Sequence, residues 1–389
     1  MIHDREFDIV IYGASGYTGR LVAEYMAAKY GRSVNWAMGG RSEAKLAEVR
    51  AEIGADDDTP LVVADSSDAQ QMHDLAARTA VICTTVGPYQ LYGSELVAAC
   101  AANGTGYVDL SGEPGWMHAM IAAHHAKAQE TGARIVHSCG FDSIPFDLGV
   151  LFLQEAAQEK FGAPAVRVKG RVRAMNGEFS GGTAASLGAT MAAVAQNPDL
   201  RALLTNPFAL TDGFRGPEQP ADSAPYEDDT LGAWVAPFIM APINTKNIHR
   251  SNALLGHAYG ADFLYDEMMV TGAGDAGKAA AEAAAGANPF GDAPPKPGEG
   301  PTKESREAGN YDVLFIGTTA AGEEIRAAVT GDMDPGYGST SKMLAESALC
   351  LLHDCDDVGG GVYTPAAAMG LRLITRLVAD AGLTFTLEG

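Results

Sequence analysis

The feature that most constrains how this chain can fold is a set of three glycines, Gly13, Gly16 and Gly19, in the stretch FDIVIYGASGYTGRLVAEYM. An apolar run typical of a buried strand precedes them and apolar residues at helical spacing follow, so we expect a helix from about Tyr17 to Tyr30. In a strand–turn–helix context the first glycine permits a tight turn, the second lets a diphosphate approach the backbone, and the third allows close helix–strand packing. The stretch predicts a dinucleotide-binding unit; a glycine turn kept only for packing is the alternative.

Strand-like and helix-like patterns alternate along the first third of the chain. Six strand-like runs, each followed by a helix-like run, occur in residues 7–13, 34–40, 60–65, 79–87, 106–112 and 133–140. Such alternation is typical of a doubly wound parallel sheet. The expected fold class is α/β, with an N-terminal Rossmann-type doubly wound parallel sheet, a second α+β domain, and C-terminal helices returning to the first domain. The expected domains are residues 1–142, residues 143–331 with a mobile insertion at 271–310, and residues 332–389.

The stretch VNWAMGGRSEAKL favours a phosphorylated cofactor. NAD sites usually have an acid at the end of the second strand, where it binds the ribose hydroxyls. This chain has Arg41 there, followed by Ser42 and Lys45, and a guanidinium suits a 2′-phosphate. We therefore predict NADP(H); a solvated surface arginine is the alternative.

Further cofactor contacts are expected where the parallel strands end, because ligands of open α/β sheets bind at that edge. Asp65 ends the third strand, although it is also placed to cap the next helix, and the VGP loop follows the fourth strand. The predicted cofactor-binding residues are Gly13, Ser15, Gly16, Tyr17, Thr18, Gly19, Arg41, Ser42, Lys45, Asp65, Thr85, Val86, Gly87 and Pro88.

The loops after the fifth and sixth strands should lie near the nicotinamide and the substrate. Their polar residues and those of the VGPY loop give four candidate proton donors: Tyr89, Ser111, Asp142 and Ser143. Tyr89 is the first choice, because a phenol can donate a proton without carrying charge into an apolar site. A packing role for its ring is the alternative.

The composition argues against several classes of protein. The chain has 27 basic and 49 acidic residues, a net charge of −22, and this field repels nucleic acid. The sequence offers no apolar run long enough for a membrane-spanning helix and no zinc-type spacing, so we predict no transmembrane segment and no metal. Five cysteines without a CxxC pair fit a reducing cytoplasm.

Five stretches taken together resemble a known family: GASGYTG, GGRS, VGPY, YVDLSGE and GFDSIPFDLG. The chain is similar to the saccharopine-dehydrogenase-like oxidoreductases and, within them, to the trans-acting enoyl reductase branch of mycobacterial lipid synthesis. The C-terminal MDPGYGSTSKMLAESALCLL and GGGVYTPAAAMG also resemble that branch. The resemblance implies an NADP-binding domain and reduction of an acyl-chain double bond while a polyketide or fatty-acid synthase carries the chain. It also implies that the three glycines are phosphate-binding positions and that VGPY is a loop beside the cofactor.

Two other functions stay open. One is an amino-acid-linked dehydrogenase of the saccharopine type, which would need clustered cations such as the row Arg167, Lys169, Arg171 and Arg173; a solvated face is the alternative for that row. The other is a non-catalytic NADP-binding scaffold. The chain is also compatible with a homodimer.

Patterns in the second half are weaker. We expect a strand in 165–179, a helix in 180–198, a loop over 210–230, a hairpin in 311–332, and helices in 339–352 and 364–382. The apolar segment 233–243 is compatible with an acyl channel, with contact to a membrane surface, or with a buried strand and turn.

Overall fold

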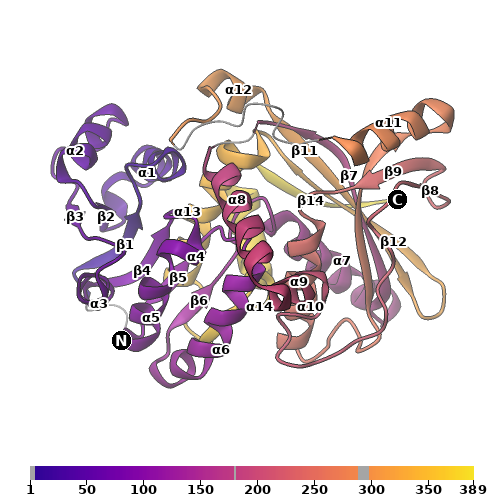
Figure 1. Cartoon of the computed structure of the whole chain (residues 1–389), viewed down its shortest axis with the longest axis horizontal. Coiled ribbons are helices and arrows are strands. Elements are labelled where there is room, and N and C mark those ends of the chain that lie inside the picture. Colours follow the sequence, from indigo (N-terminus) through magenta and orange to yellow (C-terminus); the bar gives the residue numbers. More distant parts are fainter. Residues whose placement is uncertain (1–4, 179–180, 288–297) are drawn as a thin grey trace.

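The structure of the chain is a computed structural model that describes residues 5–178, 181–287 and 298–389. Two seven-stranded sheets organise these residues and lie toward opposite ends of the molecule, with helices between them (Figure 1). The strands of sheet A, in spatial order, are β13 (Gly361–Tyr363), β6 (Arg134–Val136), β5 (Gly106–Val108), β4 (Thr79–Thr84), β1 (Phe7–Tyr12), β2 (Trp36–Gly40) and β3 (Leu61–Val63).

Sheet A confirms the predicted doubly wound parallel fold. Each of its pairs is parallel, and the strand order changes direction between β1 and β4, where such sheets bind ligands. The six predicted strands are present, and β13 adds a seventh from far along the chain. The helices that follow β1 to β5 are α1 (Tyr17–Lys29), α2 (Glu43–Glu52), α3 (Ala69–Arg78), α4 (Tyr89–Tyr92), α5 (Ser94–Asn103) and α6 (Pro114–Thr131).

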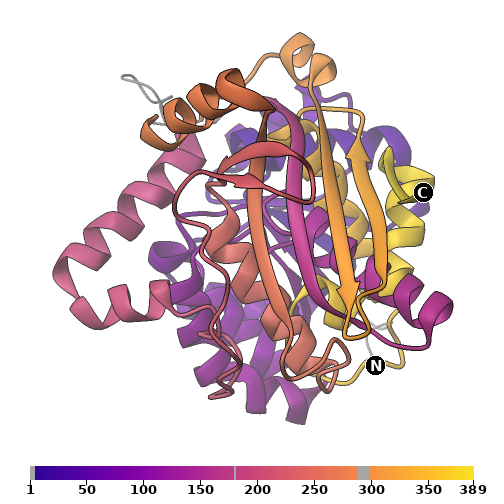
Figure 2. The same cartoon turned by 90° about the vertical axis from the view of Figure 1, so that its right-hand side faces the viewer.

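Sheet B is mixed. In spatial order its strands are β14 (Leu383–Glu388), β12 (Glu324–Gly331), β11 (Asn310–Thr319), β7 (Ala165–Asn176), β10 (Leu264–Gly272), β9 (Ala233–Pro237) and β8 (Tyr226–Asp228). β7 and β10 pair in parallel, and β11 and β12 form the predicted antiparallel hairpin. Figure 2 looks onto the outer face of this sheet, with most helices behind it.

The remaining helices are α7 (Ile144–Phe161), α8 (Gly181–Gln196), α9 (Pro198–Thr205), α10 (Ala241–Leu254), α11 (Gly274–Gly286), α12 (Lys303–Ala308), α13 (Thr340–His353), α14 (Pro365–Ala368) and α15 (Gly370–Asp380). One apolar core joins the two sheets through Ile11 of β1, Phe146 of α7, Leu349 of α13 and Phe315 of β11. α13 packs on α1, β4 and β5, so a late part of the sequence covers the first sheet.

Several expectations for the second half are wrong. Segment 233–243 contains strand β9, in agreement with one of its three readings, but its last residues begin helix α10, which we did not expect because its buried faces are polar and show no apolar period. The predicted helix over 364–382 is two helices, α14 and α15, which separate at Gly370 with φ +52°. The expected loop over 210–230 contains strand β8.

The row of cations on β7 is not a solvated face either. Arg171 is fully buried between Asp228 and Asp266, since β8 and β10 bring both carboxylates to it.

The predicted insertion at 271–310 includes α11 and α12, and its middle, residues 288–297, lies outside the described residues. Within the described part of the chain, no helix is long and apolar enough to cross a membrane.

Candidate cofactor and active site

The glycine turn between β1 and α1 has the shape of a phosphate cradle. Gly13 has φ +97°, and a Cβ atom on it would lie 2.8 Å from the side chains of Thr85 and Val86. A Cβ on Gly19 would lie 2.1 Å from the Gly13 carbonyl oxygen, so only glycine lets the helix approach the turn this closely. Ser15 and Gly16 are exposed at the top of the turn.

The start of α1 offers free hydrogen-bond donors. No side chain caps this helix, and its first turn has no acidic residue. The Arg20 N–H donates to the Gly16 carbonyl, so the N–H groups of Tyr17 and Thr18 have no intrahelical acceptor. Free amides and the positive end of the helix dipole favour a diphosphate here.

The end of β2 presents an unpaired cation. Arg41 is exposed and forms no salt bridge with the described residues, and its charge helps to lower the pKa of Asp65, after the stronger effects of the hydrogen bonds from the Ser67 N–H and hydroxyl. A Cβ on Gly40 would lie 3.6 Å from the Ser15 hydroxyl, so this loop adjoins the cradle. The arrangement suits a 2′-phosphate beside a diphosphate.

The other predicted contacts around β2 and β3 have local roles. The Ser42 hydroxyl caps α2 by accepting from the Lys45 N–H, at 3.4 Å, and the Lys45 side chain is exposed. The Asp65 carboxylate accepts from the Ser67 N–H and hydroxyl in a turn of its own, whereas Asp68 caps α3. Asp65 therefore does not cap the helix.

The loop after β4 lies against the glycine turn. Thr85 donates from its hydroxyl to the Gly13 carbonyl, at 3.4 Å, while Gly87 is exposed. Thr85, Val86 and Pro88 are partly exposed along the same edge. Glu113, from the loop after β5, accepts from the N–H groups of Tyr89 and Gln90 and so fixes the end of the loop.

A buried polar cluster ties the ends of β5 and β6 together, and the sequence reasoning missed it. The Asp109 carboxylate accepts from the Tyr107 hydroxyl at 2.9 Å and from the Ser138 N–H at 2.9 Å, and lies 2.7 Å from Nδ1 of His137. Nε2 of His137 has no partner among the described residues. The sequence contained a signal for this cluster. Asp109 directly follows β5 and His137 directly follows β6, and these two strands are neighbours in the sheet, with Val108 opposite Val136.

Three of the four candidate proton donors are buried and already hydrogen-bonded. The Tyr89 hydroxyl donates to the Thr84 carbonyl at 3.2 Å, accepts from the Leu110 N–H, and its ring stacks on Trp116. Ser111 accepts from the Glu113 N–H. Burial raises the pKa of Tyr89 well above its usual value, which does not favour its ionisation.

Ser143 has a similar constraint. Its hydroxyl donates to Oδ1 of Asn244 at 3.1 Å and accepts from Asn247 at 2.9 Å, so it joins the start of α7 to α10.

Asp142 differs from the other three. Its side chain is half-buried, and no hydrogen bond or ion pair to it occurs within the described ranges. Its Oδ2 atom lies 3.9 Å from the position of a Cβ on Gly112, and Met240 lies beside the same glycine. Burial raises the pKa of Asp142 to about 6, which leaves the carboxyl group able to hold or release a proton near neutral pH.

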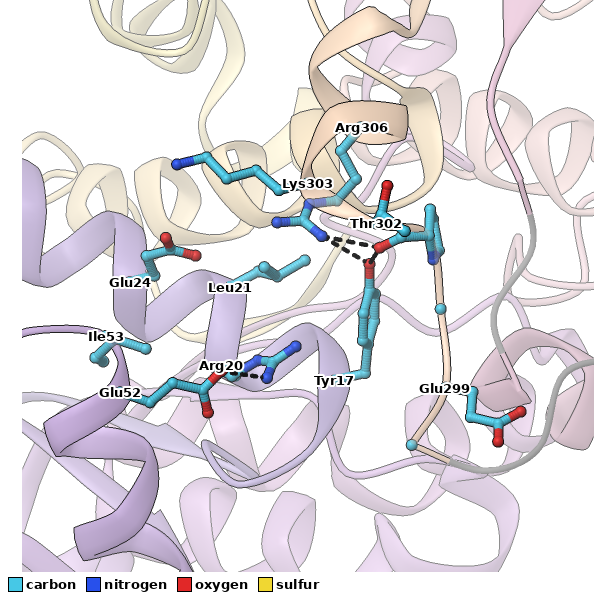
Figure 3. Close-up of a pocket in the computed structure, with 13 residues that line it drawn as sticks. Tyr17, Arg20, Leu21, Glu24, Glu52, Ile53, Glu299, Thr302, Lys303 and Arg306 are labelled. Atoms are coloured by element: carbon cyan, nitrogen blue, oxygen red, sulfur yellow. Dashed lines mark hydrogen bonds and ion pairs between the residues drawn. The ribbon is translucent and has the colours of Figure 1, made fainter.

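Residues 298–306 of the second half lie beside α1 (Figure 3). Tyr17 donates from its hydroxyl to the Pro301 carbonyl, and Nη1 of Arg306 donates to the Tyr17 hydroxyl at 3.1 Å and to Pro301 at 2.9 Å. The cavity between this segment, α1 and α2 has a volume of about 450 Å³. Tyr17 therefore uses its side chain to hold the second half of the molecule, while its N–H stays at the cradle.

Helix α10 is the other feature that the sequence reasoning missed. It is buried and mostly polar, and its side chains bond to elements far apart in the sequence. Asn244 donates to Glu267 of β10 at 2.7 Å, and Arg250 donates to the carbonyls of Leu210 and Val362. Nothing in the local sequence could indicate these partners.

Comparisons with known proteins agree with this geometry. The saccharopine dehydrogenase NADP-binding domain matches residues 9–136. A Mycobacterium tuberculosis relative is 42% identical, and proteins named trans-acting enoyl reductase from Mycobacterium bovis and Mycobacterium ulcerans are 38% and 39% identical; in each case the alignment covers 96% of both chains. Saccharopine dehydrogenase (L-Glu forming) from Saccharomyces cerevisiae has the same fold, with a TM-score of 0.56 at 10% identity over 98% of this chain and 100% of that chain. This chain therefore belongs to the saccharopine dehydrogenase-like family, as an NADP-dependent oxidoreductase related to the mycobacterial trans-acting enoyl reductases.

Proposed function

We propose that this protein reduces a carbon–carbon double bond beside the thioester carbonyl of an acyl chain. The observation that carries the proposal is the similarity to proteins named trans-acting enoyl reductase over 96% of both chains, which includes the second half as well as the nucleotide domain. "Trans-acting" implies that a separate polyketide or fatty-acid synthase carries the acyl chain. A cytoplasmic location and a homodimer remain predictions.

The geometry of the cradle supports a role for NADPH in this reaction. When bound, NADPH supplies the hydride. In the proposal, the N–H groups of Tyr17 and Thr18 hold the diphosphate, Arg41 holds the 2′-phosphate, and the loop from Thr85 to Pro88 borders the ribose and nicotinamide. The remaining task of the protein is to deliver one proton to the α-carbon.

We assign that proton to Asp142 in place of Tyr89. The Tyr89, Ser111 and Ser143 hydroxyls have partners within the fold, whereas the Asp142 carboxyl group has none among the described residues. With its pKa raised to about 6 by burial, Asp142 carries a proton in a usable fraction of molecules near pH 6 to 7.

The amino-acid-linked alternative loses its main support. Arg171 pairs with Asp228 and Asp266, Lys169 with Asp228, Arg167 with Asp266, and Arg173 with Asp312 and Glu388. The row on β7 thus has no cation left for substrate carboxylates.

The test is NADPH oxidation by the purified chain with two kinds of substrate, an enoyl N-acetylcysteamine thioester and saccharopine-type amino acids with their keto partners, and with buffer alone as the blank. We expect consumption with the enoyl thioester only, and mass spectrometry should find the saturated thioester. Activity with the amino-acid substrates, or binding of NADPH without turnover of either, would refute the proposal in favour of one of the two alternatives.

A further inference from the structure

Helix α8 has an uncharged composition that stands out in this acidic chain. Its 16 residues, GGTAASLGATMAAVAQ, include no acidic and no basic side chain. Leu187 and Met191, one helical turn apart, are 41% and 63% exposed. Exposed apolar side chains lose the free energy that burial would provide, so a cluster of them calls for an explanation.

Contacts along α8 place it across the cofactor site. Near its start, Thr183 is hydrogen-bonded to the Tyr337 hydroxyl at 2.9 Å, and the Tyr337 ring lies edge-on to Tyr17, at the phosphate cradle. One turn on, the Ser186 hydroxyl would lie 3.7 Å from a Cβ on Gly87, so α8 adjoins the loop after β4. Figure 1 shows α8 in front of the region between the two sheets.

Helix α4 extends the exposed apolar area. Nε2 of Gln90 donates to the Thr190 hydroxyl at 3.3 Å, which holds α4 beside α8. Leu91 and Tyr92, which directly follow Gln90, are 61% and 44% exposed, and Met191 directly follows Thr190. We call Leu91, Tyr92, Leu187 and Met191 together the α4–α8 apolar surface.

We propose that the α4–α8 apolar surface binds the hydrocarbon tail of the acyl substrate. This inference rests on the proposed function and adds to it the place where the hydrocarbon part of the substrate lies. Two observations favour a hydrocarbon as the occupant. Helix α4 directly follows the loop from Thr85 to Pro88, and a Cβ on Gly87 would lie 3.7 Å from the Ser186 hydroxyl of α8, so the surface adjoins the proposed cofactor site. Helix α8 also has no charge that a fatty chain would have to desolvate.

The experiment compares a long and a short substrate on the same protein. We expect the double variant Leu187→Ser/Met191→Ser to raise KM for the dodecenoyl N-acetylcysteamine thioester by about tenfold or more, while KM for the butenoyl thioester and the Kd of NADPH stay unchanged. The matched control is Leu371→Ser/Val378→Ser on α15, whose side chains are 48% and 49% exposed; it should change neither KM. Equal effects on both thioesters, or no effect on either, would overturn the proposal.

A direct binding measurement keeps this inference separable from the proposed function. If the wild-type protein turns over neither thioester, the proposed reaction fails, and fluorescence titration with dansylated undecanoic acid then tests the surface alone. Weaker binding of this probe in the α8 variant supports a hydrocarbon site, and equal binding overturns it. If probe binding is unchanged but the α8 variant no longer forms a dimer that the wild-type protein forms, the surface binds a second copy instead. If probe binding is unchanged but the variant no longer binds vesicles that the wild-type protein binds, the surface contacts a membrane instead.

Discussion

In our proposal, the choice of cofactor depends on Arg41. It is exposed at the end of β2, beside the phosphate cradle, and forms no salt bridge within the described part of the chain. The sequence led to this prediction, because an arginine after the second strand replaces the acid of NAD sites.

Replacement of Arg41 by alanine should therefore weaken NADPH binding and leave NADH binding unchanged. Loss of charge-assisted hydrogen bonds costs about 1.5–3 kcal/mol, so we expect the Kd of NADPH to rise by about tenfold to a hundredfold. Isothermal titration of both cofactors measures this. Arg32→Ala is the control, since Arg32 pairs with Asp56 and Asp58 away from the cradle. An equal rise in the Kd of NADH would mean that Arg41 does not bind the 2′-phosphate.

Asp142→Asn should lower kcat by about a hundredfold or more and leave the Kd of NADPH unchanged, because an amide cannot supply the proton. If Asp142 supplies the proton as proposed, its protonated form is the active one, so kcat should fall as pH rises through about 6, and the variant should lose this dependence. Steady-state rates between pH 5 and 8 check both expectations.

Tyr89→Phe is the companion variant to Asp142→Asn. It keeps the ring that stacks on Trp116 and should keep turnover. The reverse pattern, with Tyr89→Phe inactive and Asp142→Asn active, would return the role to Tyr89.

At the scale of elements, the parts that the sequence predicted share one property: local spacing encodes them. In residues 7 to 140, apolar strand-like runs alternate with helix-like runs, many of them separated by glycines, so the order of the elements could be predicted there. Helix α10 could not, because Asn244, Ser251 and Arg250 are buried among partners from other elements. Strand β13 was not predicted either, because it lies outside the alternation of strands and helices that identified the equally short β3, β5 and β6.

The cations of β7 also have partners on other elements that local spacing does not reveal, and the loss of such a partner has a measurable cost in stability. Burial acts to raise the pKa of Asp228, but the hydrogen bonds and charges of Lys169 and Arg171 overcome it and lower the pKa to about 2. Asp228→Asn should therefore cost about 3–5 kcal/mol at pH 7, since it leaves buried cations without their partner.

Urea unfolding measures the cost of Asp228→Asn. Asp312→Asn, which breaks a part-exposed pair with Arg173, is the control and should cost under about 1 kcal/mol. Because the pKa of Asp228 is lowered on folding, its contribution to the free energy of unfolding is full above about pH 4 and disappears as pH falls toward 2. Similar costs for both variants would contradict this account.

At the scale of the whole molecule, hydrogen bonds through Ser143, Asn244 and Glu267 join the active-site edge of sheet A to sheet B. Burial raises the pKa of Glu267 to about 8. Between about pH 4.5 and 8 the folded protein holds a proton there that the unfolded chain has released, so this carboxyl group lowers stability as pH rises through that window.

Glu267→Gln should remove that part of the pH dependence. An amide stays neutral, so the free energy of unfolding of the variant should fall less steeply between pH 5 and 8, by up to about 1.4 kcal/mol per pH unit. Thermal or urea unfolding at several pH values gives the two slopes. Parallel curves for the variant and the wild-type protein would show that Glu267 does not titrate in this range.

Strand β13 has a consequence for how the molecule is made. It pairs with β6, and α13 covers β4 and β5, so residues beyond 339 finish a sheet whose other strands end at residue 136. During translation, β6 therefore lacks its neighbour β13 while more than half of the protein is synthesised. We therefore expect a nascent chain that stalls midway to leave β6 as an unpaired edge of the sheet.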